Sequence, residues 1–258
     1  MSILVLGFYF SWAQTDKQPL EKKIYSSVGG EFIFSFANTN QTIETTNLRF
    51  SAWYHVQWHW HFDFNNNIGT FWGLGSRNVG YASIPENNNN FVKGFTSYNA
   101  TTEQFEINDP IYKDKQMSDI IRRVYTIGVP LGLKLGLFDK SLFLFFGAEV
   151  ELPFHYKNKV WIDDEKIYKS SEWFSKQVNP VLYSSFVGVQ LPWGINIKFK
   201  WYWNDLMNPN YDYYSVKPYA YQNSQMYYFS FGMNMFNAKR ALKTIQHVET
   251  TDDNSYSM

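Results

Sequence analysis

The feature that most constrains this chain is an alternation of apolar and polar side chains with a period of two residues. It is clearest in 125–137, where the even positions are small, charged or proline. The odd positions there are Tyr125, Ile127, Val129, Leu131, Leu133, Leu135 and Leu137. Successive side chains of a β-strand point to opposite faces, so this segment is predicted to be a strand with one apolar and one polar face.

The same alternation recurs along the chain and predicts eight strands. They are expected at 24–37, 48–64, 68–82, 125–137, 142–156, 181–191, 195–203 and 229–235. The connections between them are short at 65–67, 138–141 and 192–194, and long at 38–47, 83–119, 157–178 and 205–222. Alternating short and long connections are typical of membrane barrels, which have tight periplasmic turns and larger outer loops. The fold class predicted for 24–236 is therefore all-β, an eight-stranded antiparallel transmembrane β-barrel.

Composition indicates which face of this barrel meets lipid. Hydrophobic residues make up 45% of the chain and aromatic residues 20%. The polar face is rich in glycine and sparsely charged, which suits a narrow interior filled by side chains better than a wet surface. The apolar faces reach the roughly 9–11 residues that a tilted strand needs to cross a bilayer. We therefore expect an integral protein of the bacterial outer membrane, with an interfacial aromatic girdle formed by Trp58, Trp60, Trp201, Trp203 and Tyr156.

The two ends of the chain lie outside the predicted barrel. Residues 3–10 form an apolar run too short to span a bilayer, and Ser11 and Ala13 are small residues before Gln14. This pattern predicts a signal peptide at 1–13, with a buried strand as the alternative. Residues 14–23 are then a polar periplasmic lead-in. Residues 237–258 are expected to be a periplasmic polar tail, whose alternative role is to tether a partner.

The polar face carries the candidate functional residues. The predicted interior polar network consists of Glu31, Arg77, Lys134, Glu149, Glu151, Lys198 and Lys200. One interpretation is an ion path or a gated salt-bridge switch. The other is a packed interior in which charges must pair because desolvation is costly. An eight-stranded lumen is just wide enough for its own side chains, which favours the packed interior.

Metal binding and catalysis find less support in the sequence. His55, His59, His61 and Asp63 share a face, but residues i and i+2 stand ~7 Å apart along a strand, which is loose for one ion. Ser185 is expected on the outward face with no outward histidine, so it forms no catalytic set. The sequence therefore predicts no catalytic, metal-binding or cofactor-binding residues and no cofactor. The 23 Lys and Arg residues balance 23 Asp and Glu residues, and no nucleic-acid partner is expected.

Several segments carry a family resemblance. They are Trp12-Ala13-Gln14, Gly73-Leu74-Gly75-Ser76-Arg77-Asn78-Val79-Gly80, Gly128-Val129-Pro130-Leu131-Gly132-Leu133-Lys134 and Gly232-Met233-Asn234-Met235-Phe236. With them the chain resembles a small Bacteroidota-type outer-membrane β-barrel protein over most of 24–236. The last strand of that family usually ends the protein on an aromatic residue, whereas here further residues follow Phe236. The resemblance implies an architecture and no particular activity.

The function expected from these features is non-enzymatic. We expect a structural or accessory subunit of a larger outer-membrane complex. The alternatives are a narrow ion or small-solute channel through the polar interior and, with less support, an outer-membrane lipid-modifying enzyme. The expected partners are outer-membrane lipid and, as further candidates, other outer-membrane or periplasmic proteins.

Overall fold

The computed structural model of the protein describes residues 23–39, 44–52, 55–86, 90–220 and 223–234. The predicted signal peptide and tail lie outside these residues. So do most of the predicted lead-in and the last two residues of the predicted barrel, Met235 and Phe236.

Eight long strands close into a ring in which each strand pairs antiparallel with its neighbours. In ring order they are β1 (Lys23–Thr39), β4 (Val56–Asp63), β5 (Ile68–Pro85), β8 (Asp119–Leu137), β9 (Leu142–Ile162), β11 (Leu182–Gln190), β12 (Ile195–Asp205) and β13 (Ser224–Asn234). The ring closes where β13 pairs with β1, for example at Phe32 and Phe231. The predicted eight-stranded antiparallel barrel is thereby confirmed.

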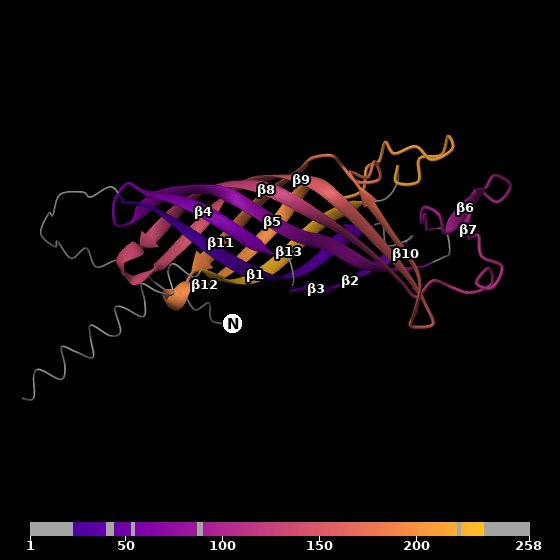
Figure 1. Ribbon diagram of the computed structural model, residues 1–258, viewed down its shortest axis with the longest axis horizontal. Coiled ribbons are helices and arrows are strands. Elements are labelled where there is room, and N and C mark those ends of the chain that lie inside the picture. Colours follow the sequence, from indigo (N-terminus) through magenta and orange to yellow (C-terminus); the bar gives the residue numbers. More distant parts are fainter. Residues whose placement is uncertain (1–22, 40–43, 53–54, 87–89, 221–222, 235–258) are drawn as a thin grey trace, which may run out of the picture.

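The two ends of the barrel differ in their connections (Figure 1). At one end, here called the turn end, the strands are joined by 64–67 and by the short 3-10 helices η1 (Phe138–Lys140) and η2 (Pro192–Gly194). Trp193 takes a left-handed conformation (φ 66°) in the last of these turns. At the opposite end, the loop end, lie 90–118, 174–181 and 206–220. Short turns therefore occur where the sequence predicts them.

The wall of the barrel is apolar outside and polar inside. On β8, Leu131 is 64% exposed and Ile127 50%, whereas Lys134 is 1% exposed. The outward apolar stretch Ile127–Leu137, at about 3.3 Å per residue and a tilt of about 40°, rises roughly 25 Å, the height of the lipid-facing band of outer-membrane barrels. Among the described residues, no helix has the length and hydropathy needed to cross a membrane.

A β-bulge near the loop end corrects one predicted face. Thr126 pairs with Pro153 and Tyr125 with His155, so Phe154 is an extra residue on β9. One extra residue reverses the alternation beyond it. Tyr156, expected in the outer girdle, is 1% exposed in the interior, and His155, expected inside, shares the outward face of β9 with Lys157.

The predicted long loops contain more strand than expected. The segment 38–47 includes β2 (Glu44–Asn47), which pairs with β5, while β3 (Arg49–Ser51) pairs with β1. The segment 157–178 includes the end of β9 and the strand β10 (Glu165–Trp173), and the two form a hairpin beyond the barrel. The segment 83–119 contains the hairpin of β6 (Thr96–Asn99) and β7 (Gln104–Ile107). These expectations of loops were wrong because β2, β10 and the end of β9 extend the barrel sheet above the apolar band, whereas β6 and β7 form a separate two-stranded sheet.

Candidate functional site

The centre of the barrel interior holds a cluster of ion pairs built around Arg77 of β5. Its Nε donates to Glu31 Oε1 at 2.8 Å, and its Nη1 donates to Glu149. On the other side of Glu31, Lys198 Nζ lies 2.7 Å from Oε2, and Ser230 Oγ donates to the same oxygen at 2.8 Å. A single arginine thus joins carboxylates from β1 and β9.

Lys200 of β12 closes the cluster on the opposite side. Its Nζ donates to Glu149 Oε2 at 2.8 Å and also to Glu151. Glu151 accepts further hydrogen bonds from Thr126 Oγ1 at 2.8 Å and from the Tyr202 hydroxyl at 3.1 Å. All of these side chains are buried.

This cluster is electrically balanced. It consists of Glu31, Glu149 and Glu151 with Arg77, Lys198 and Lys200, and we call it the interior network. Three carboxylates face three cations, so no net charge is left in the low-dielectric interior, where an unpaired charge is costly. The strands place these residues at inward positions, and Gly128 leaves room for them, because a Cβ there would collide with the carboxylate of Glu149.

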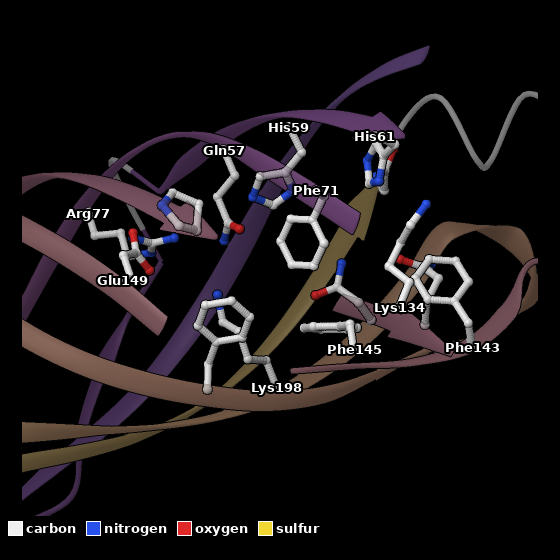
Figure 2. A pocket seen from close by; sticks show the side chains of 15 residues that line it. Gln57, His59, His61, Phe71, Arg77, Lys134, Phe143, Phe145, Glu149 and Lys198 are labelled. Atoms are coloured by element: carbon white, nitrogen blue, oxygen red, sulfur yellow. The ribbon is translucent and has the colours of Figure 1, made fainter. Parts of the chain in front are cut away.

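Lys134, predicted to belong to the same network, lies apart from it. It pairs with Asp63, and its Nζ donates to the Tyr25 hydroxyl at 3.0 Å. Figure 2 shows Arg77 beside Glu149 and Lys134 on the far side of Phe71. Phe71 is one of three inward aromatic rings, with Phe145 and Phe186, whose centroids lie 6.0–6.3 Å apart. This aromatic layer lies between Lys134 and the network, and a cavity of about 60 Å³ beside it is lined by Lys134 and also by Arg77 and Glu149 of the network.

Two of the three inward histidines of 55–61 are hydrogen-bonded to serine hydroxyls. His61 Nε2 lies 2.8 Å from Ser27 Oγ, and His55 Nε2 lies 2.9 Å from Ser51 Oγ. His59 stands between them and lines the cavity. Within the described part of the chain, no group of three or more His, Asp or Glu side chains is arranged to hold a metal ion.

Near the loop end the interior is filled by apolar side chains. Ile33, Val79, Val124, Tyr156, Leu182 and Tyr228 of the strands form one cluster with Phe91, Tyr211 and Tyr219 of the loops. Beside it Arg122 Nη1 donates to Glu44 Oε2 at 2.8 Å and to Ser83 Oγ at 3.0 Å. This further buried ion pair was not predicted from the sequence, although the alternation of β8, continued from Thr126 toward the N-terminus, places Arg122 inside.

Comparisons with known proteins give little beyond architecture. No family model matches the chain, and no curated protein matches it significantly. Among solved structures, it is similar to Ail, the attachment invasion locus protein of Yersinia pestis, with TM-score 0.34, 10% identity, and 81% of this chain and 97% of that chain covered. It is also similar to Neisserial surface protein A, with TM-score 0.34, 8% identity, and coverage of 82% and 97%.

The closure of the ring between β13 and β1 and the apolar outer wall determine the structural class of the protein. The chain is an eight-stranded outer-membrane β-barrel. Its interior holds the network, the aromatic layer and the apolar cluster.

One histidine and one serine form a pair on the outward wall of the barrel. No outward histidine was predicted, but His155 is outward, and its Nε2 lies 2.7 Å from Ser171 Oγ of β10. Its ring is stacked on Trp173 at 4.4 Å between centroids. Among the described residues, no carboxylate lies within 4.0 Å of a ring nitrogen of His155, so no third member of a catalytic triad orients the imidazole there.

Proposed function

We propose that this protein is a non-enzymatic structural or accessory barrel whose loop end presents an ordered platform to another component of the outer membrane. The platform consists of 90–118, β10 with 174–181, and 206–220. One observation carries the proposal: a second hydrophobic core lies beyond the barrel at the loop end. There Val92, Phe95, Ile107 and Met117 of the 90–118 segment pack against Ile120, Val160 and Ile162 of β8 and β9. Outer-membrane barrels have short turns in the periplasm and larger loops outside, so we infer that this platform is extracellular.

A barrel that served only as a membrane anchor would not need this second core. Two antiparallel strands can be joined by a two-residue turn. Ordering each loop residue costs about 1–2 kcal/mol of backbone entropy, and buried apolar area offsets this cost. Ordered loops on a rigid scaffold are where binding residues concentrate. The platform therefore supports a binding role for this end of the molecule.

The platform also exposes apolar side chains. Ile111 is 75% exposed and Tyr214 87%, and Phe174 borders a groove of about 500 Å³ with Pro180 and Tyr211. Aromatic residues are enriched in the cores of protein interfaces, and exposed apolar side chains at a groove suit a protein partner. We expect the partner to cover this side of the platform.

Photo-crosslinking in native outer membranes tests the proposal. A photoreactive amino acid replaces Ile111 or Tyr214 on the platform, and Lys140 at the turn end serves as the matched exposed control. We expect a discrete protein adduct from the platform positions and none of the same mass from Lys140. Purification as a lone monomer, with no adduct from either platform position, would overturn the accessory role.

The cavity beside Lys134 favours a second candidate, a narrow channel. It lies on the turn side of the interior network and is lined by His59, Lys134 and Lys198. A conducting path would require the ion pairs of Arg77 and the apolar cluster above them to open. Planar-bilayer recordings discriminate: the accessory role predicts no single-channel events, and steady conductance steps would establish the channel.

The His155 and Ser171 pair favours a third candidate, a lipid-modifying enzyme. Its test is the mass spectrum of lipid A from cells with and without the gene. Unchanged acyl chains and phosphates are expected for a non-enzymatic barrel, and a mass difference that Ser171→Ala abolishes would establish an enzyme.

A further inference from the structure

The outward wall at the loop end carries a row of cations on neighbouring strands. Arg123 of β8 stands directly opposite Lys157 of β9, and Lys159 of β9 stands directly opposite Lys169 of β10. We call these four residues the rim row.

The rim row is unfavourable in the protein alone. Like charges directly opposite each other on paired strands destabilise a sheet. None of the four cations lies within 4.0 Å of a carboxylate in the part of the chain that the structure describes. Nε of Arg123 is buried without a hydrogen-bond partner among the described residues. Buried donors are normally paired, so an unpaired donor among four cations favours an anionic ligand.

The position of the row shows which anion it meets. Directly below it, toward the apolar band, lie four aromatic side chains, Tyr125, Phe154, His155 and Trp173, which stack on one another. Lys157 Nζ lies 4.9 Å from the centre of the Tyr125 ring. Aromatic belts in membrane proteins lie at the level of the lipid headgroups. The cations immediately above such a belt therefore stand at the headgroup phosphates of the outer leaflet.

We propose that the rim row binds the phosphate groups of an anionic, phosphorylated glycolipid headgroup in the outer leaflet, of the lipid A type. Arginine donates paired hydrogen bonds to phosphate oxygens, and lysine binds phosphate as a point charge. Basic clusters beside a membrane-spanning segment bind anionic headgroups in the same way. The lipid acyl chains then lie along the apolar wall of β8 and β9. This site rests on the inference that the loop end is extracellular, and it does not depend on the accessory role of the platform.

Binding of defined lipids to the purified full-length protein tests the proposal. The probes are bisphosphorylated lipid A, its dephosphorylated form and inorganic phosphate, added to the protein in neutral detergent and followed by native mass spectrometry. The test variant replaces Arg123, Lys157, Lys159 and Lys169 with Gln. The matched control replaces four exposed lysines elsewhere, Lys113, Lys140, Lys176 and Lys217, and removes the same charge. Thermal unfolding verifies that both variants are folded.

We expect wild type and control to bind bisphosphorylated lipid A at least ten-fold more tightly than its dephosphorylated form, and the rim variant to lose this preference. Inorganic phosphate at equal concentration should not displace the lipid. Equal binding by the rim variant, or equal binding of both lipids by wild type, would overturn the proposal. Full displacement by inorganic phosphate would show a free-phosphate site and would overturn the lipid assignment. A protein adduct on the platform is neither required nor excluded by these outcomes, so the two proposals fail separately.

Discussion

The interior network and the rim row place similar charged residues in opposite situations. Inside, three carboxylates meet three cations, and each charge has a partner from another strand. On the rim, four cations face one another in pairs across three strands with no carboxylate between them. Burial in low dielectric requires pairing, whereas a surface at the headgroup layer tolerates unpaired charge. The comparison indicates that the interior charges hold the barrel together and that the rim charges are available to a ligand.

The largest effect is expected from removing the central cation of the network. Arg77→Met leaves Glu31 and Glu149 buried with one cation fewer, and breaking a buried ion pair costs about 3–5 kcal/mol. The measurement is urea unfolding of the refolded protein in lipid vesicles. Arg123→Met on the rim is the matched control and should change the unfolding free energy by less than about 0.5 kcal/mol. Equal losses in both variants would remove the distinction between the two regions.

A charge on the apolar wall should cost somewhat less. The variant is Leu131→Arg, because Leu131 lies in the middle of the outward stretch of β8. An arginine at the bilayer midplane destabilises a barrel by about 2–4 kcal/mol. Tyr125→Arg, at the aromatic belt on the same strand, should cost about 0–1 kcal/mol, because the penalty falls toward the interface. Urea unfolding in the same vesicles measures both. If the two variants were equally stable, the assignment of the lipid-facing band would be wrong.

The sequence predicted the barrel well because one physical rule, the two-residue period, governs every strand. It placed Glu149, Glu151 and Arg77 inside, and it identified the short turns. It could not locate Lys134, because alternation assigns a face and not a height, and the height decides that Lys134 meets Asp63 and not Glu149. It also misplaced Tyr156 and His155, because a single extra residue at Phe154 reverses which side chains of β9 point inward. No residue type in the sequence predicts that bulge.

The rim row was missed for a related reason. Lys157, Lys159 and Lys169 lie in a segment whose polar composition predicts a loop. Only pairing of β10 with β9 brings Lys159 opposite Lys169. Register between strands is a property of the folded sheet. The sequence specifies it only weakly where a strand is polar on both faces.

A smaller effect distinguishes the sign of charge in the two regions. Lys159→Glu converts the like-charge pair with Lys169 into an opposite-charge pair, which should stabilise the protein by about 0.2–1 kcal/mol in neutral detergent. Lys200→Glu in the interior should destabilise strongly, because it adds a third carboxylate beside Glu149 and Glu151. Thermal midpoints of the two variants should therefore move in opposite directions. A loss of stability in Lys159→Glu would mean that the rim row is already neutralised within the protein.

The smallest effect concerns an ion pair of the platform, outside the membrane. Lys93 Nζ lies 2.8 Å from Glu172 Oε1, and Ser175 and Gln177 donate to Oε2 of the same carboxylate. Burial alone would raise the pKa of Glu172, but these hydrogen bonds outweigh it and hold the pKa below its ordinary value of 4.5. The hydrogen bond to Glu172 likewise raises the pKa of Lys93 above 10.5.

These directions determine how the pair responds to pH. A carboxylate with a lowered pKa in the folded state stabilises above its unfolded pKa, and this contribution is lost as the pH falls below about 4.5 through the lowered value. Lys93 keeps its charge throughout that range, so the stability of the pair changes only where Glu172 becomes protonated. The pair is partly exposed and contributes about 0.2–1 kcal/mol. Glu172→Gln should therefore unfold at a lower temperature than wild type at pH 7, and the difference should shrink toward pH 3. A difference that stays constant across this range would show that the carboxylate charge contributes nothing and that its hydrogen bonds alone hold the 90–118 segment on β10.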